Sequence, residues 1–201
     1  MDMLVNGRGL VRWGIYDEPV GRINYEDYRL ETPLGYRIPS FMRRLLANQF
    51  HFIGIIGPEL IAGIGVVDLK YLSNGFFYLY DRETGEMTET KKMGHPFSSA
   101  SIEPFPEKPR SAFSSGSLAI DMRRDWLKAS GDDISLELSL DPNATTPLRI
   151  CTRAGYRGWV YTQKTSPLRV KGSIKNRAGQ HDLSSPTYWA LSDWTCGFMR
   201  S

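Results

Sequence analysis

Residues 60–90 have the pattern of a β-meander, and this block constrains the fold more than any other feature of the chain. Leu60 to Leu69 is an apolar run, and Phe76 to Tyr80 combines aromatic residues with leucine. Residues 81–85 have the composition of a hairpin loop and lead into a further strand at 86–90. In the first run both alternating sets of side chains are apolar, which predicts a central strand covered on both faces.

One short helix is expected ahead of the sheet. Ser40 to Gln49 follows a proline, and Ser40 is a suitable N-cap. The residues before it mix aromatic side chains with proline and glycine, which is typical of an extended, loop-rich segment. We therefore expect a loop-rich lead-in with a short helix over residues 1–48 and an antiparallel β domain over 49–201. Three residues of the helix are spaced to form one apolar stripe: Phe41, Leu45 and Leu46.

Further strands are expected on both sides of a proline-rich segment. Residues 94–110 contain Pro96, Pro104, Pro106 and Pro109, and this composition predicts a loop or lid. Short strands separated by turns, with hardly any helix, predict a mainly β chain, either an antiparallel β-sandwich or a lipocalin-like barrel. The last strand runs towards the chain end without a closing partner, which predicts an exposed aromatic edge and an incomplete sheet. The remaining expected strands are 49–56, 113–122, 134–140, 148–152, 158–163, 168–174 and 188–193.

Composition and charge exclude several classes of protein. An aromatic content of 12% favours sheets, and a formal net charge of +3 is too small to indicate a nucleic-acid partner. No secretory signal is visible at the start, and no run approaches the roughly 18 to 20 apolar residues of a membrane-spanning segment. We therefore expect a cytoplasmic protein. Cys151 and Cys196 have no Cys or His neighbour at ligand spacing, so no disulfide, metal site or cofactor is expected.

A basic stretch follows the central strands. From Arg149 to Gln180 every ionisable side chain other than Tyr and Cys is basic. Grouped on one face, these side chains would form a surface for anionic lipid or nucleic acid. Alternation along strands would instead scatter them over ordinary solvent-facing positions, and we favour that interpretation.

Several polar and aromatic residues on the predicted strands form a candidate site. In a barrel they can converge at the mouth of an apolar pocket, where burial would shift the pKa of an acid or base. A buried ion pair or a capped turn explains the same charges, and we favour that explanation. His51 suits a hydrogen-bonded sheet position better than a general base. The catalytic candidates are Asp68, Lys164 and Asp193, and the ligand-binding candidates are Tyr161, Trp194 and Trp159.

Three groups of segments carry a family resemblance: residues 65–71 with 81–86, 161–164 with 167–172, and 193–197. In order and spacing they resemble the family catalogued as domain of unknown function 2804. Its members continue past the Asp-Trp segment with another β-rich stretch. The resemblance therefore implies that this chain is an N-terminal portion, completed by a C-terminal half or by self-association. A weaker likeness, at the level of fold, links it to two-barrel, lipocalin-like carotenoid hydratases.

Three functional hypotheses remain. The leading one is a binding module that holds an apolar or amphipathic small molecule in an aromatic-lined cavity. The second is an enzyme on the same cavity, a hydratase, isomerase or cyclase with Asp68 or Asp193 as acid or base. The third is the anionic-surface module suggested by the basic stretch, and it ranks last.

Overall fold

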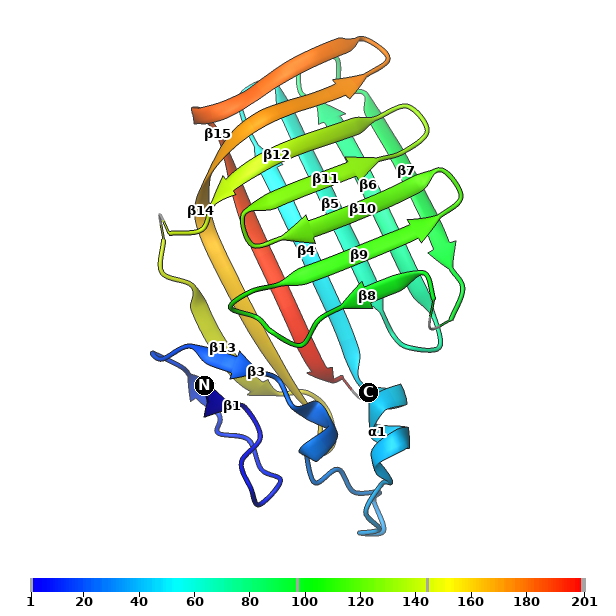
Figure 1. Cartoon of the computed structure of the whole chain (residues 1–201), viewed down its shortest axis with the longest axis vertical. Helices are drawn as coiled ribbons and strands as arrows, with labels where there is room; N and C mark the ends of the chain where they lie inside the picture. The colour runs from blue at the N-terminus through cyan, green and yellow to red at the C-terminus, as the bar shows by residue number, and fades with distance from the viewer. Residues whose placement is uncertain (1, 97, 144, 200–201) are drawn as a thin grey trace.

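The computed structural model describes residues 2–96, 98–143 and 145–199, and these residues form a mainly β structure (Figure 1). The expected fold class is confirmed: the strands form a nearly closed, antiparallel, barrel-like sheet accompanied by one α-helix. The first elements are β1 (Asp2–Met3), β2 (Gly14–Ile15), β3 (Val20–Arg22), a 3₁₀ turn η1 (Tyr25–Asp27) and α1 (Ser40–Leu46). The meander and its continuation are β4 (Asn48–Ile56), β5 (Leu60–Asp68), β6 (Ser73–Asp81), β7 (Met87–Gly94) and β8 (Ala100–Ile102). The remaining strands are β9 (Arg110–Ser115), β10 (Leu118–Arg123), β11 (Trp126–Ser130), β12 (Ser135–Asp141), β13 (Leu148–Arg153), β14 (Trp159–Asn176) and β15 (Gly179–Phe198).

The strands are arranged in two layers that pack face to face. The rear layer runs in the order β7, β6, β5, β4, the C-terminal half of β15, the N-terminal half of β14, β13 and β2. The front layer runs from β8 through β12 to the C-terminal half of β14 and the N-terminal half of β15. In Figure 1 the front strands cross the rear strands at a steep angle. Apolar side chains from the two inner faces fill the space between the layers.

Two long strands belong to both layers and connect them. The ladder between β14 and β15 changes register between Thr165 and Leu168 and again between Arg169 and Lys171. Pro167 lies at the first change, and proline has no backbone N–H to donate to a ladder. The interrupted pairing lets the same two strands turn from the rear layer into the front layer.

The meander is confirmed by β5, β6 and β7, and its outer face has an unusual composition. Phe50, Phe52, Phe76 and Tyr78 form a row with ring centroids 6.1 to 6.4 Å apart. The Phe76 ring lies over Gly65, where an added Cβ would be 2.2 Å from the ring. The central strand β5 is therefore covered on its outer side by rings of its own sheet.

Several expectations about strand limits are wrong. Residues 113–122 form two strands, β9 and β10, because Gly116 adopts a φ of 57° in a tight turn between them. The proline-rich segment contains β8, and β11 was not predicted at all. The expected strands at 158–163 and 168–174 are one continuous strand, β14. The final strand is longer than expected and lies between β4 and β14, so it is not an exposed edge, and its Tyr188, Trp194 and Phe198 are buried.

The helix is confirmed, but its expected apolar stripe is not. Phe41 and Leu45 are 65% and 40% exposed, whereas Arg43 is the buried residue of α1. Arg43 attaches the helix through hydrogen bonds to the backbone carbonyls of Glu26 and Ile38. The polar contacts of Arg43 and the packing of the half-buried Leu46 against the core therefore position α1, so only one of the three residues of the expected stripe packs on the core.

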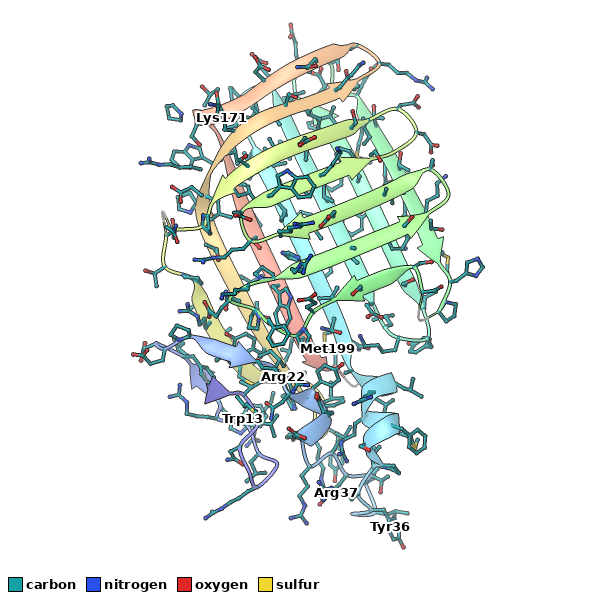
Figure 2. All side chains as sticks on the ribbon, viewed as in Figure 1. Trp13, Arg22, Tyr36, Arg37, Lys171 and Met199 are labelled. Atoms are coloured by element: carbon teal, nitrogen blue, oxygen red, sulfur yellow. The ribbon has the colours of Figure 1, made fainter. Side chains whose placement is uncertain are left out.

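The N-terminal segment packs on the lower end of the rear layer (Figure 2). The Tyr28 ring lies 5.8 Å from the rings of both Trp159 and Phe198, and its hydroxyl donates to the carbonyl of Arg157. The division of the chain at residue 48 stays a prediction. Within the described residues, no helix has the length and apolar character that crossing a membrane would require.

Candidate functional site

A cavity of about 310 Å³ lies where the front layer stops covering the inner face of the rear layer. Its walls come from the rear strands β4, β13, β14 and β15 and from the ends of the front strands β10 and β12. Residues from loops complete them: Pro106, Glu107, Pro109, Arg124, Pro142, Asn143, Thr145, Thr146 and Pro147. Ligand cavities are commonly found in the mouths of β-barrels, and their usual volumes begin at about 300 Å³. We call this space the interlayer cavity.

The lining of the interlayer cavity is mixed, with three aliphatic side chains beside polar groups such as Gln163 and Thr165. Ile53, Leu140 and Leu168 line the cavity together with Trp194 and Ser192. The indole N–H of Trp194 is buried and makes no hydrogen bond with the described residues. The Ser192 hydroxyl lies 3.3 Å from Nε2 of His51, whose Nδ1 lies 2.8 Å from the Ser111 hydroxyl. The indole N–H therefore lies beneath the surface of the cavity as an unsatisfied donor, next to apolar side chains.

One wall contains a buried ion pair. The Arg149 guanidinium contacts Glu107 through two bonds, Nε to Oε1 at 2.6 Å and Nη2 to Oε2 at 3.0 Å. The Glu107 hydrogen bond raises the pKa of Arg149. Beside this pair, Gln163 donates to the carbonyl of Pro106 at 2.9 Å and accepts from the Tyr161 hydroxyl at 3.3 Å. Burial, followed by the charge of Glu107, raises the pKa of Tyr161, so its hydroxyl stays protonated.

Two further arginines lie at the rim. Arg123 is 3.2 Å from the Asp121 carboxylate, and its guanidinium sits 5.3 Å from the centre of the Trp126 ring. Arg124 donates to the side-chain carbonyl of Asn143 at 3.1 Å. Within the described part of the chain, no carboxylate forms an ion pair with Arg124. The rim therefore carries a positive charge that has no ion-pair partner among the described residues.

The structure brings two of the three catalytic candidates together, but away from the cavity. Lys164 and Asp193 face each other across β14 and β15 and form an ion pair, with side chains 53% and 20% exposed. They alternate with Gln163 and Trp194, so they point to the opposite face of the sheet. Asp68 lies at the end of β5, where it accepts from the backbone N–H and the ammonium group of Lys70, 2.8 and 2.5 Å away. Lys164 with Asp193 thus forms an ion pair, and Asp68 caps a turn, which are the two structural explanations given for these charges in the sequence analysis.

The aromatic candidates lie on the inner face. Trp194 and Tyr161 meet edge to face with centroids 6.4 Å apart, and Trp194 lines the cavity. Trp159 is fully buried between Tyr28 and Phe198, outside the cavity lining. Of the aromatic candidates, Trp194 is therefore the one with direct access to the interlayer cavity.

The basic stretch does not form one continuous surface. Four of its side chains have carboxylate partners: Arg149 with Glu107, Arg157 with Glu31, Lys164 with Asp193 and Arg177 with Asp133. Arg149 faces inward, whereas Lys171 projects from the far end of the molecule (Figure 2). The alternation along β13 and β14 therefore distributes the positive charges over different faces.

The described parts of the chain contain neither a reactive cysteine nor a metal-binding group. Cys151 and Cys196 are free and buried, and burial raises the pKa of Cys151 to about 12, so it stays a neutral thiol. Over residues 2–96, 98–143 and 145–199, no group of three or more His, Cys, Asp or Glu side chains could hold a metal ion.

Sequence reasoning missed Arg124, Gln163 and Ser192 as cavity residues. Gln163 and Ser192 each neighbour a residue that was singled out, Lys164 and Asp193, and strand alternation places them on the other face. The alternation of side chains along these two strands could therefore have identified Gln163 and Ser192 from the sequence. Arg124 lies in a turn between β10 and β11, and only the packing of the two layers brings it to the cavity.

Comparison with known proteins gives a family and a fold. The model of the family described as Domain of unknown function (DUF2804) matches residues 2–201. No functionally curated protein matches the chain. The crystal structure of a protein from Nitrosomonas europaea, provisionally assigned as AttH, superposes with a TM-score of 0.51 at 12% sequence identity. The match covers 77% of this chain and 52% of that protein, so the chain spans about half of its length. At this identity the likeness concerns the fold alone.

Proposed function

Because this chain belongs to the family described as Domain of unknown function (DUF2804), whose description assigns no activity, we propose a function from the interlayer cavity. The cavity binds an amphipathic small molecule that carries an anionic group. The apolar part of the ligand contacts Ile53, Leu140 and Leu168, and the anionic group lies at Arg124. This proposal retains the small-molecule hypothesis from the sequence and adds the charge of the ligand.

The observation that carries the proposal is the combination of aliphatic side chains in the cavity lining with an arginine at the rim that has no carboxylate partner among the described residues. Arg124 has no carboxylate partner among the described residues, and the buried N–H of Trp194 makes no hydrogen bond there. An unsatisfied buried donor in a native structure requires an explanation, because it has lost its hydrogen bonds to water. A ligand with an anion at one end pairs with Arg124, and a hydrogen-bond acceptor at its other end satisfies the Trp194 N–H once the ring turns towards the cavity.

A set of chemically matched probes tests the anionic end of the ligand. Decanoate should bind, and Arg124→Gln should weaken its binding about tenfold, or roughly 1.4 kcal/mol. Binding of the neutral analogue decanol should be unchanged, because it has no charge to lose. Isothermal titration calorimetry measures all three. Lys171→Gln is the matched control, since it removes an exposed positive charge outside the cavity lining. Absence of decanoate binding, or equal losses in the two variants, would contradict the proposal.

A second comparison tests the role of the Trp194 indole. The hydroxyl of ω-hydroxydecanoate offers an acceptor at the apolar end, so this acid should bind more tightly than decanoate. Trp194→Phe keeps an aromatic ring and removes the N–H, and the two acids should then bind equally. A preference that survives in Trp194→Phe would show that another group contacts the hydroxyl.

The enzyme alternative has less support from the geometry. None of Asp68, Lys164 and Asp193 belongs to the cavity lining, and each has a counter-charge within its own ion pair. Their catalytic role stays a prediction. The anionic-surface alternative also has less support, because Arg149, Arg157, Lys164 and Arg177 already contact carboxylates.

A further inference from the structure

A second hollow, of about 570 Å³, lies in the N-terminal segment and has a different chemistry. It is bounded by the turn at residues 6–9, by the region of η1, by the turn near Gly35 and by α1. Four arginines line it: Arg8, Arg29, Arg37 and Arg43. We call it the arginine hollow. Figure 2 shows Arg37 beside Tyr36 at the end of the molecule opposite Lys171.

Arg43 is the most unusual residue of the arginine hollow. It is only 6% exposed, and no carboxylate of the described residues lies within ion-pair distance of it. Its Nε donates to the carbonyl of Glu26 at 2.8 Å and its Nη1 to the carbonyl of Ile38 at 2.5 Å. Its Nη2 makes no hydrogen bond with the described residues. The Nη2 atom reaches solvent, and the carboxylates of Asp27 and Glu26 act on this cation without an ion-pair contact, so Arg43 keeps a donor free for an anion.

Among the described residues, the carboxylates near the hollow form an ion pair with only one of its four arginines, Arg29. Glu31 pairs with Arg29 at 2.7 Å and also with Arg157, which lies outside the hollow. Asp27 accepts a hydrogen bond from the buried Asn24 at 2.8 Å and forms no ion pair among the described residues. Arg8, Arg37 and Arg43 therefore face the hollow without a carboxylate partner in the described chain. Burial and then the charge of Arg37 lower the pKa of Arg43, as expected for cations that repel each other.

We propose that the arginine hollow is a binding site for the phosphoryl group of a phosphorylated small molecule. The planar guanidinium group presents parallel N–H donors that match the spacing of oxygens on phosphate. An oxoanion in the hollow supplies the counter-charge that Arg43 lacks and an acceptor for its Nη2. The exposed side chains of Arg8 and Arg37 contact the same anion from the open side. This site is separate from the interlayer cavity, and the two lining sets share no residue.

Pyrophosphate is the probe for the first experiment, measured by isothermal titration calorimetry and by the melting temperature at low salt. Pyrophosphate should bind the wild-type protein and raise its melting temperature, because a ligand of the native state stabilises it. Arg37→Gln should weaken binding about tenfold, since it removes one charged hydrogen-bond donor. Arg43→Lys should weaken pyrophosphate binding to a similar extent, because the ammonium group of lysine keeps the charge but lacks the parallel N–H donors of the guanidinium group.

Arg44→Gln is the matched control. Arg44 is the next residue of α1, is exposed, and does not line the hollow. Its variant loses the same charge and should bind pyrophosphate as the wild type does. Melting temperatures without pyrophosphate verify that each variant folds, and Arg37 is exposed, so its variant tests the site even if Arg43→Lys does not fold.

Three outcomes would overturn the proposal. One is the absence of heat and of a melting shift at about 10 mM pyrophosphate, a concentration well above a millimolar dissociation constant. Another is equal weakening by Arg37→Gln and Arg44→Gln, which would indicate diffuse attraction to positive charge. The third is binding of acetate as tight as that of inorganic phosphate, which would assign the hollow to carboxylates. Tighter binding of pyrophosphate than of phosphate supports a ligand with linked phosphoryl groups.

Discussion

At the scale of single residues, His51 shows how burial determines chemistry. It is fully buried, and desolvation lowers its pKa from 6.5 to about 3. In the unfolded chain the same imidazole takes up a proton near pH 6.5. Between pH 6.5 and 3 the unfolded state therefore binds more protons than the folded state. As the pH is lowered through this range, the free energy of unfolding should fall by about 1.4 kcal/mol per pH unit.

Urea denaturation at pH 6.5 and pH 5 measures this dependence. His51→Gln removes the titrating group and retains a side chain that can hydrogen-bond to Ser111 or Ser192. Between these two pH values the wild type should lose about 2 kcal/mol more than the variant. His95→Gln, at an exposed position, should keep the wild-type dependence. Equal pH dependence in wild type and His51→Gln would contradict the burial argument.

The same residues show what sequence can reveal about a site. Alternation correctly placed His51 on the face of Gln49 and Ile53, because a strand has a fixed period of two. The expectation that Asp193 and Trp194 converge at one pocket was wrong, because neighbouring residues of a strand point to opposite faces. Alternation did not reveal which face would border a cavity, because that depends on where the front layer ends. Arg124 and Glu107 reach the cavity only through this packing between layers.

At the scale of elements, two glycines in the rear layer should respond differently to the same substitution. A Cβ at Gly197 in β15 would lie 2.1 Å from the backbone oxygen of Trp159, which cannot move without breaking the ladder. A Cβ at Gly65 in β5 would meet the Phe76 ring, which is half-buried and can turn towards solvent. Gly197→Ala should therefore cost about 3 kcal/mol and Gly65→Ala about 1 kcal/mol. Urea denaturation measures both, with Gly7→Ala, which meets no atom within 4 Å, as the control.

Strand existence was easier to predict than strand extent. β12 was predicted almost to the residue, because Leu136, Leu138 and Leu140 alternate strictly with polar residues. β11 was missed because Trp126 to Ser130 is short and contains a lysine between its buried Leu127 and Ala129. β14 was divided at Pro167, which bends the strand instead of ending it. Local patterns report the period of a strand, whereas continuation through a proline depends on pairing with a distant partner.

At the scale of the whole molecule, the two layers share strands and should unfold together. β14 and β15 each contribute one half to the rear layer and the other half to the front layer. Neither layer can separate without breaking the longest ladder of the sheet. This sharing distinguishes the molecule from a sandwich of two independent sheets, in which each layer could lose order by itself.

Leu168 lies in the bend of β14, is 2% exposed, and provides a direct test of this coupling. Leu168→Ala should lower the free energy of unfolding by about 2 to 4 kcal/mol, because it leaves a cavity at a buried position. Hydrogen exchange should then show the same loss of protection in β5 of the rear layer and in β10 of the front layer, since both depend on the shared strands. Loss confined to β10 would mean that the front layer opens alone. In that case β14 would act as a hinge between two separately stable sheets, and a ligand in the interlayer cavity would link their stabilities.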